Sequence, residues 1–246
     1  MAGETIKTRA VCLGITPWSK TSHVVSWLTP SGRVGTVVKG AVRPKSAFLG
    51  QYDLNYTCEI LYYARAKGEL HALREASPLS LREGLRQSYR ALALADYFRW
   101  LSGELSPAGE DARPWYDRLT RALDTLASDP AARRLRTLVA FELDVLRLAG
   151  LKPDFSGYDP AADWSSFGIE SGSFDAVGEG RHVRVSRAVA ALLDRPAAGD
   201  PGDETVEGAA RVLGAFLQFH LDLAPDVRRS VLRLVNGVPG GPLRPE

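Results

Sequence analysis

Three cations lie close together in the segment 39–48, which reads KGAVRPKSAF. They are Lys39, Arg43 and Lys45, with a glycine and a proline between them. Glycine and proline favour a loop, which can hold the charged side chains outward. Lysine and arginine bind phosphate groups without reading a base sequence. The segment therefore predicts contact with a nucleic-acid backbone rather than covalent chemistry.

The distribution of charge supports the same interpretation. Residues 1–50 contain seven Lys or Arg and one acid, Glu4, which is a net charge of +6. Residues 1–80 hold ten basic and five acidic residues (+5), and the remainder holds 21 and 24 (−3), which together give the +2 of the chain. A positive field of this kind attracts phosphate, whereas a surface that serves only solubility normally mixes both signs.

Cations at other predicted turns extend this patch. The predicted DNA-binding residues are Lys20, Arg33, Lys39, Arg43, Lys45, Arg65 and Lys67. Three aromatic residues, Trp18, Phe48 and Tyr52, lie near these turns and suit two roles. They can stack on bases, as in proteins that bind single strands, or they can fill the core of a barrel, which is the commoner role. The residues alone leave both roles open.

Known catalytic arrangements do not occur in the sequence. The chain has neither an HExxH motif nor a GxxxxGK[ST] loop, and its histidines are scattered at His23, His71, His182 and His220. Asp154 and Asp159 are near enough in sequence to bind Mg²⁺ together, although acids in loops are ordinarily solvated. We therefore predict no catalytic residue and no cofactor.

The basic loops must be carried by strands. Residues typical of strands recur in five runs, at 9–15, 22–29, 34–39, 52–63 and 69–75. Pro30-Ser31-Gly32 and Lys67-Gly68 supply turns, and Pro78 is expected to end the strand region. Five short strands within about 70 residues favour a small closed barrel of the OB-fold type, a common binder of nucleic acids.

Beyond residue 80, apolar residues recur every three to five positions, which is typical of helices. Helices are predicted at 81–105, 114–126, 131–149, 186–193, 204–223 and 225–234. Residues 151–183 lack this period. The predicted fold class is α+β, with an OB-fold DNA-binding domain at 1–79 and an α-helical domain at 80–246. Within the latter, 151–183 is expected to form an irregular inserted lobe.

The composition is that of a soluble globular protein, with 45% hydrophobic and 24% charged residues. No apolar run has the length of a membrane span, and the first seven residues lack a secretory pattern. We therefore expect a cytoplasmic, nucleoid-associated protein with no membrane partner. In that reducing compartment, Cys12 and Cys58 are expected to be buried free thiols.

Four sets of short segments occur in order along the chain. They are Lys39-Gly40-Ala41 with Arg43-Pro44-Lys45-Ser46; Leu73-Arg74-Glu75-Ala76; Phe141-Glu142-Leu143 with Leu148-Ala149-Gly150-Leu151-Lys152-Pro153; and Phe219-His220-Leu221 with Arg229-Ser230. Their order and spacing, with the pattern of strands followed by helices, resemble the RecO family of bacterial DNA recombination and repair mediators along most of the chain.

The resemblance implies a protein that binds single- and double-stranded DNA and anneals complementary strands without catalysis. It implies three protein partners in the RecFOR pathway: RecR, the C-terminal tail of single-strand-binding protein (SSB) and, indirectly, RecA, which such proteins help to load. The acidic, apolar tail needs a hydrophobic pocket rimmed by cations. Candidate residues are Arg133, Arg134, Leu135, Arg136 and Leu138, although solvated helix arginines explain the same pattern equally well.

The chain departs from the family at one place. Many members carry two Cys-x-x-Cys pairs after the third helix, a ligand set that suits zinc. The corresponding stretches here, 153–159 and 172–178, read PDFSGYD and GSFDAVG and contain no cysteine. We therefore predict no metal in this zinc-finger-like lobe. Aromatic packing should hold it instead, through Phe155, Tyr158, Trp164, Phe167 and Phe174.

Two other functions stay open. An adaptor would use the barrel chiefly to dock proteins and would bind DNA only incidentally. A nuclease would cleave DNA with a divalent metal ion. Charge reversal at Arg43 and Lys45 separates the adaptor from the DNA-binding mediator, because an adaptor would keep its partners and its function.

Overall fold

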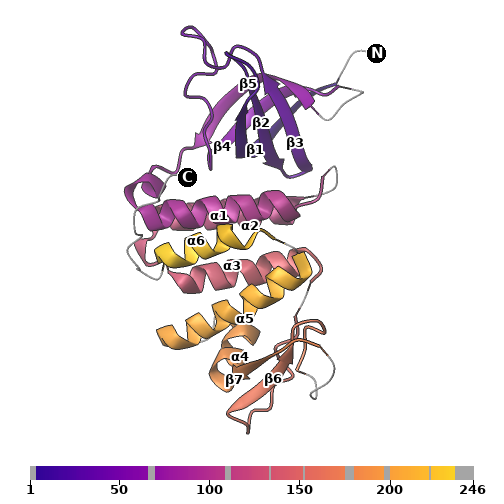
Figure 1. The fold of residues 1–246 in the computed structure, drawn as a ribbon. Helices are drawn as coiled ribbons and strands as arrows, with labels where there is room; N and C mark the ends of the chain where they lie inside the picture. The colour runs from indigo at the N-terminus through magenta and orange to yellow at the C-terminus, as the bar shows by residue number, and fades with distance from the viewer. Residues whose placement is uncertain are drawn as a thin grey trace. The chain divides into compact units, whose positions relative to one another are not determined.

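The computed structural model describes residues 4–65, 70–108, 112–132, 134–151, 153–174, 180–196, 200–221 and 223–235. Contacts within the chain define two compact units, Met1–Pro130 and Ala131–Glu246 (Figure 1). The first contains a barrel and two helices, and the change from strands to helices falls near residue 80, inside this unit. The division into domains 1–79 and 80–246 stays a prediction.

Five strands close a barrel in the order β1-β2-β3-β5-β4. Their bounds are β1 Thr5–Pro17, β2 His23–Thr29, β3 Gly32–Val38, β4 Thr57–Tyr63 and β5 Leu70–Ser80. Neighbouring strands are antiparallel except for β3 and β5, which run parallel. This closed five-stranded barrel, followed by helices, confirms the predicted fold class.

The long strand β1 closes the barrel. Its residues 5–11 pair with β4 and its residues 11–17 pair with β2. The register of the β1–β2 pair shifts between Cys12 and Gly14, which is a bulge. A bulge bends and twists a strand, so one strand can serve both sides of the barrel.

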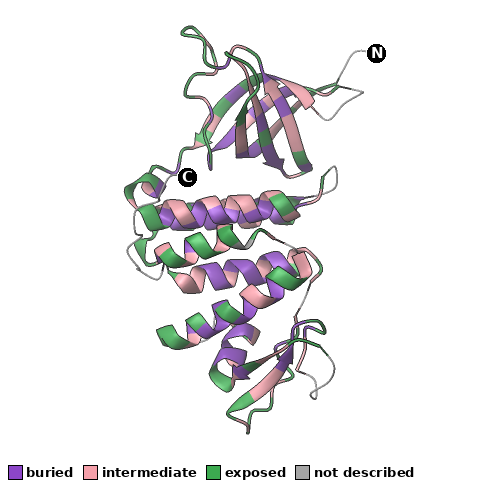
Figure 2. Cartoon of the chain, in the orientation of Figure 1, coloured by how far each residue is buried: buried purple, intermediate pink, exposed green. Residues whose placement is uncertain are grey.

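Large side chains fill the interior of the barrel, and the strands show purple buried residues beside exposed ones (Figure 2). On β4, Ile60 and Tyr62 are buried. On β2, Trp27 is fully buried, and its Nε1 donates a hydrogen bond to Thr36 Oγ1 at 2.9 Å. Because the interior is packed, a ligand of the barrel must bind its outer surface or its loops.

Two helices of the first unit contact one end of the barrel. They are α1, Tyr89–Leu105, and α2, Arg113–Ser128. Ala112 N, just before α2, donates to Pro30 O in the β2–β3 turn at 3.1 Å. The Arg33 guanidinium at the start of β3 donates to Gly103 O in α1. Since β2 and β3 are antiparallel, the β1–β2 turn and the end of β3 lie at the opposite end of the barrel.

Buried polar side chains also join the barrel to these helices. Arg82 has a buried guanidinium that donates to Asp124 Oδ1 in α2 at 2.8 Å and to Asn55 O, just before β4, at 2.6 Å. The Asn55 amide in turn donates to Asp96 Oδ1 in α1 at 3.0 Å. Burial lowers the pKa of Arg82, and the nearby Asp124 carboxylate opposes this effect.

The strand region continues further than the sequence predicts. Pro78 lies inside β5, which continues to Ser80, so the expectation that Pro78 ends the strands is wrong. Pro78 pairs with Cys58 next to a register shift in the β4–β5 ladder. A bulge tolerates proline, which has no amide hydrogen to donate.

The helix predicted from residue 81 begins only at Tyr89. Arg82 has a left-handed φ of 50°, and a short 3-10 helix, Glu83–Gln87, follows it. Ser88 then caps α1, and its side-chain oxygen accepts from Ala91 N at 3.3 Å. The leucine spacing runs through this break because the period of apolar residues does not record a change of backbone direction.

The second unit contains four helices and a two-stranded sheet within its described residues. The helices are α3 Leu135–Leu148, α4 Arg187–Asp194, α5 Asp203–Leu221 and α6 Pro225–Val235, and the strands are β6 Trp164–Gly168 and β7 His182–Ser186. The inserted lobe is thus more regular than the sequence predicts, because two strands of five residues carry too short a period to stand out. None of the helices in the described ranges is long and apolar enough to cross a membrane.

A buried ion pair joins three helices of the second unit. Glu142 in α3 is fully buried, and Arg228 in α6 donates to its two carboxylate oxygens at 2.7 and 2.9 Å. Arg228 also donates to Ala210 O in α5 at 2.7 Å. A Cβ added at Gly214 in α5 would lie 2.4 Å from Arg228 Nη1, so a larger residue there would displace the guanidinium.

We predict that Arg228→Met lowers the free energy of unfolding by about 3–5 kcal/mol, because it removes the guanidinium from a buried carboxylate. Arg229→Met is the matched control. Its guanidinium pairs with Asp226 on the surface at 3.2 Å, with both side chains largely exposed, so its loss should cost no more than about 1 kcal/mol. Urea denaturation followed by circular dichroism measures both, and equal losses would contradict the prediction.

Cys12 and Cys58 are buried free thiols, as predicted. Burial raises the pKa of Cys58 to about 12 and also raises the pKa of Cys12. A raised thiol pKa favours the folded state below the pKa of the unfolded thiol, about 8.5, and this contribution is lost as the pH rises above it.

We therefore expect both thiols to react slowly with Ellman's reagent at pH 8 in the native protein, because the reactive thiolate is scarce and covered. Unfolding in urea should release two reactive thiols per chain, which the absorbance of the product counts. Rapid reaction of either thiol before unfolding would show that the barrel interior is open.

Candidate nucleic-acid interface

Two loops meet at the end of the barrel opposite α1 and α2. His23, the first residue of β2, pairs with Pro17 at the end of β1 and with Val38 at the end of β3. The β1–β2 turn, residues 18–22, and the start of the β3–β4 connection, residues 39–51, therefore leave the barrel at the same level. We call these two segments the basic loop pair.

Hydrogen bonds join the two segments. Val42 N donates to Thr21 O at 3.3 Å, and Gly40 N donates to the side-chain oxygen of Ser22 at 3.3 Å. Gly40 has a left-handed φ of 68°, which favours glycine, and an added Cβ would lie 3.2 Å from the Arg43 side chain. The basic loop pair is thus one hydrogen-bonded structure.

The predicted aromatic residues divide between the two roles. Tyr52 is buried in the barrel core, where its hydroxyl lies 2.9 Å from His23 Nδ1, and burial raises its pKa to about 12. Phe48 packs partly against the same core. Trp18, in contrast, exposes 64% of its surface. Phe48 and Tyr52 therefore anchor the longer loop, and only Trp18 is placed to contact a ligand.

Four of the seven predicted DNA-binding residues lie in the basic loop pair. They are Lys20, Lys39, Arg43 and Lys45, and all four are exposed. Within the described residues, no carboxylate lies within ion-pair distance of any of them. The sequence from 5 to 52 contains no Asp or Glu. Their positive charge is therefore available to an anionic ligand.

The other three predicted cations are not part of this group. Arg33 lies at the opposite end of β3, where it bonds to Gly103 O of α1. Arg65 follows β4 and is exposed, and its backbone N donates to His71 Nδ1 at 3.2 Å. Lys67 lies outside the described residues.

Arg74 is an exposed cation of the barrel that the sequence prediction did not include. The guanidinium carbon of Arg74 lies 4.1 Å from the centroid of the Tyr63 ring on the outer face of β4 and β5. Ala72, two residues earlier, pairs with Val37 near the end of β3, so Arg74 stands close to the level of Lys39. Its position after the buried Leu73 is the signal that indicates an outward side chain.

Each histidine has a structural hydrogen-bond partner that is not a carboxylate. The partners are Tyr52 Oη for His23, Arg65 N for His71, Gly180 O for His182 and Ile169 O for His220. The two acids near enough in sequence to bind Mg²⁺ are used in local turns. Asp154 accepts from Ser156 N and Oγ at 2.9 and 2.6 Å, and Asp159 accepts from Ala161 N at 2.8 Å.

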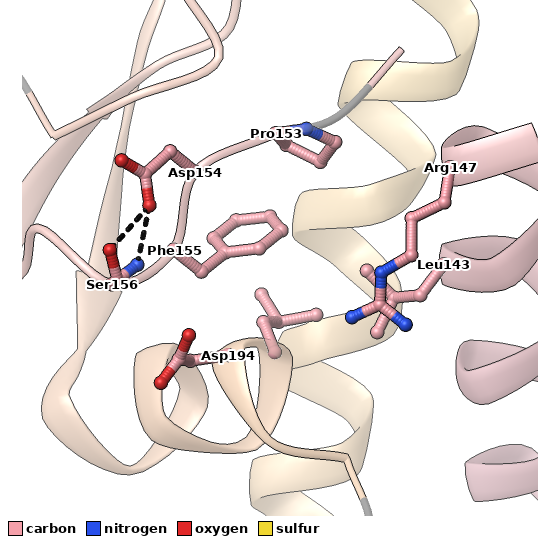
Figure 3. Close-up of a pocket in the computed structure, with 8 residues that line it drawn as sticks. Leu143, Arg147, Pro153, Asp154, Phe155, Ser156 and Asp194 are labelled. Atoms are coloured by element: carbon pink, nitrogen blue, oxygen red, sulfur yellow. Dashed lines mark hydrogen bonds between the residues drawn. The ribbon is translucent and has the colours of Figure 1, made fainter. Parts of the chain in front are cut away.

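A pocket of about 420 Å³ lies between α3, α4 and the lobe of the second unit. Figure 3 shows Arg147 on one side and Phe155 with Asp154 on the other. Arg147 pairs with Asp144 at 3.1 Å, and Asp154 is engaged by Ser156. The cation of this pocket is already paired, and the pocket also carries carboxylates, which repel phosphate. It is therefore a weaker candidate for phosphate binding than the basic loop pair.

Aromatic packing holds the lobe, as predicted for four of the five residues named. Phe155 stacks on Phe167 with ring centroids 4.8 Å apart, and Phe174 lies 5.2 Å from Phe167 and 6.3 Å from Tyr158. The prediction for Trp164 is wrong. Its ring is 53% exposed because it lies three residues before Phe167 and so faces the other side of β6.

The lobe has no described cluster of metal ligands. Among the residues that the structure describes, no three or more His, Cys, Asp or Glu side chains are grouped to hold a metal ion. Part of the second cysteine-free stretch, residues 175–178, lies outside the described residues. The absence of a metal in the lobe stays a prediction.

The residues predicted for the SSB tail do not form one exposed surface. Leu138 is fully buried and therefore not accessible to a partner, so its assignment is corrected. Arg136 donates to Pro196 O at 2.8 Å and lies 3.7 Å from Asp200. Arg134 is exposed, Leu135 packs partly on the core, and Arg133 lies outside the described residues.

Two family models match the chain, Recombination protein O N terminal over residues 1–82 and Recombination protein O C terminal over residues 86–229. The chain belongs to the RecO family. This finding confirms the resemblance drawn from the short segments. The basic loop pair lies within the part that matches the N-terminal model, and the lobe lies within the part that matches the C-terminal model.

Several proteins named DNA repair protein RecO are similar to this chain. The protein of Hamiltonella defensa subsp. Acyrthosiphon pisum is 30% identical over 233 residues, which are 89% of this chain and 93% of that protein. The protein of Gloeobacter violaceus is 27% identical over 90% of both chains. The match to the protein of Alkaliphilus metalliredigens, at 28% identity, spans 60% of this chain and 59% of that protein.

Proposed function

We propose that the basic loop pair binds the sugar–phosphate backbone of DNA and that the protein acts as a non-enzymatic mediator of recombination repair. The observation that carries this proposal is the group of four exposed cations on two hydrogen-bonded loops, in a stretch of sequence without a carboxylate. Membership of the RecO family, whose similar proteins are named for DNA repair, supports it.

Phosphate binding by these cations explains how strands could be paired without chemistry. Lysine and arginine displace the counterions of DNA, which favours binding in proportion to the number of phosphates neutralised. Single and double strands share these phosphates, so both are ligands. Neutralising the backbone lowers the repulsion between two complementary strands and thereby promotes annealing. Because the loops are already held by hydrogen bonds, little ordering is needed on binding.

The partners implied by the family belong to the same proposal. They are RecR, the C-terminal tail of SSB and, indirectly, RecA, which the protein would help to load on SSB-coated single strands in the cytoplasm. Arg134 and Leu135 remain candidates for the tail, because both reach the surface at the start of α3.

A second candidate function is an adaptor whose barrel docks proteins. Exposed apolar side chains in the basic loop pair favour it, since Val42 is 47% and Leu49 is 49% exposed. Such an adaptor would bind DNA only incidentally, so charge reversal in the loops would leave its partner binding and its cellular function intact.

We predict that the double variant Arg43→Glu, Lys45→Glu binds both an oligonucleotide of random sequence and a duplex more weakly at low salt. The slope of log K against log salt is negative, and its magnitude should fall by about 0.7 for single strands and about 0.9 for duplex for each phosphate that is no longer neutralised. Fluorescence anisotropy in a salt series measures both the affinity and this slope.

The double variant Arg90→Glu, Arg121→Glu is the matched control, because it makes the same charge change at exposed positions of α1 and α2. Equal losses of affinity in both variants, or salt-independent binding, would refute backbone binding by the loops.

We also expect the wild-type protein to anneal complementary strands coated with SSB and the loop variant to anneal them slowly. Removing the C-terminal tail of SSB should reduce annealing of the coated strands, since the protein would no longer be recruited. Fluorescence quenching between labelled strands follows the reaction. If the wild type cannot anneal tail-bearing complexes, the mediator proposal fails. Strand cleavage that depends on divalent metal in the same mixtures would reveal a nuclease instead.

A further inference from the structure

Trp18 is exposed at the edge of the barrel. Its side chain exposes 64% of its surface, whereas Trp27 and Trp115 in the same unit are buried. Tryptophan has a large apolar area, and leaving it in water forgoes the stabilisation that burial would provide. Among the described residues, no aromatic ring or guanidinium stacks on the Trp18 indole. The indole is therefore largely exposed, and a ligand that stacks on it displaces no ring or guanidinium of the described residues.

The backbone around Trp18 is fixed. Trp18 N donates to Ser22 O at 2.8 Å, and Ser19 N donates to the same oxygen at 3.2 Å. Thr21 within this turn accepts from Val42 N of the longer loop. The indole is thus attached to a hydrogen-bonded turn that is itself tied to the second loop, which limits the conformational entropy lost when a ligand binds.

Exposed cations lie in this turn and in the loop that is bonded to it. Lys20 lies two residues after Trp18, and Lys39, Arg43 and Lys45 belong to the loop that is bonded to the turn. Val42, the residue that forms that bond, also exposes an apolar side chain. A nucleic acid has a flat base, on which an exposed ring can stack, and an anionic backbone, which unpaired cations can bind. The exposed Trp18 ring and these cations therefore suit a nucleic acid as their ligand.

Stacking on a side chain requires a base whose face is free. In a duplex each base is covered on both faces by its neighbours, so a ring on the protein surface reaches only the phosphates and sugars. In a single strand the bases can separate and stack on an aromatic side chain, as in many proteins that bind single strands. The cations contact phosphate in either form, but an indole discriminates between them.

We infer that Trp18 is a stacking platform for an unpaired base and gives the basic loop pair a preference for single-stranded over double-stranded nucleic acid. This inference rests on the proposed binding of DNA by the same loops. A strand bound in this way would be held with its bases separated, the state in which a complementary strand can pair with it. The charge of the loops favours this occupant over a protein, whose surface normally carries both signs.

The test uses three ligands with the same number of phosphates per strand: a thymidine oligomer, an abasic oligomer and a duplex. We expect Trp18→Ala to weaken binding of the thymidine oligomer by between about 5-fold and about 150-fold, the range found for loss of one stacked base. Binding of the abasic oligomer and the duplex should change by less than about twofold, and the salt dependence should stay the same, because no phosphate-binding group is removed.

Two further variants serve as controls. Trp18→Phe keeps a ring and should recover most of the affinity that Trp18→Ala loses. Trp164→Ala removes the other strongly exposed tryptophan, which lies in the second unit beneath the guanidinium of Arg184, and should leave binding unchanged. The thymidine oligomer should quench tryptophan fluorescence in the wild type and in Trp164→Phe, but not in Trp18→Phe. Since Trp18 is exposed, Trp18→Ala should unfold at the wild-type temperature.

The outcomes separate this inference from the proposed function. If Trp18→Ala binds the thymidine oligomer normally while Arg43→Glu, Lys45→Glu loses affinity, the stacking role is wrong and backbone binding stands. Equal losses of affinity for all three ligands would mean that Trp18 only shapes the loops, which also overturns the inference. If Trp18→Ala instead loses RecR or SSB and keeps DNA, the ring docks a protein. If neither variant affects DNA binding, both proposals fail.

Discussion

The closure of the barrel through β1 constrains the rest of the first unit. One strand pairs with β4 along its first half and with β2 along its second, and the bulge between Cys12 and Gly14 lies just after Val11, where the two ladders meet. The β2–β3 turn therefore meets α1 and α2, and the β1–β2 turn leaves from the other end beside the end of β3. The hydrogen bonds that join the basic loop pair form because β2 pairs with both β1 and β3, which brings residues 18–22 beside residues 39–51.

Charged groups have two uses in this protein, and the presence or absence of a partner separates them. Arg82 and Arg228 are buried and bonded to carboxylates and carbonyl groups, so they hold helices in place. The cations of the basic loop pair are exposed and have no acid within the neighbouring sequence. A paired charge adds little to the field outside a protein, whereas unpaired charges of one sign attract a polyanion. The proposed DNA surface is therefore a place where the fold leaves positive charge uncompensated among the described residues.

The lobe of the second unit shows how packing can take over where a metal-ligand motif is missing. Four aromatic rings, one from β6 and three from the segments before and after it, contact one another, and the ring centroid of Phe167 also lies 6.5 Å from that of Phe216 in α5. Such contacts depend on buried area and need no particular ligand geometry. A short strand pair completes the lobe, with Phe167 and Val185 facing the core and Trp164 facing outward.

The sequence by itself determined the closed barrel, the helices that follow, the family and the clustering of positive charge, because alternation, helical period and composition are local properties. The tertiary structure alone decided which cations act together, since Arg33 and Lys39 lie at opposite ends of the same strand and hence of the barrel. It also decided that Tyr52 is core while Trp18 is exposed, and that Leu138 is buried. The exposure of a side chain depends on which segments, distant in the sequence, pack against it. The pattern of neighbouring residues does not show which segments these are, so it cannot predict the exposure.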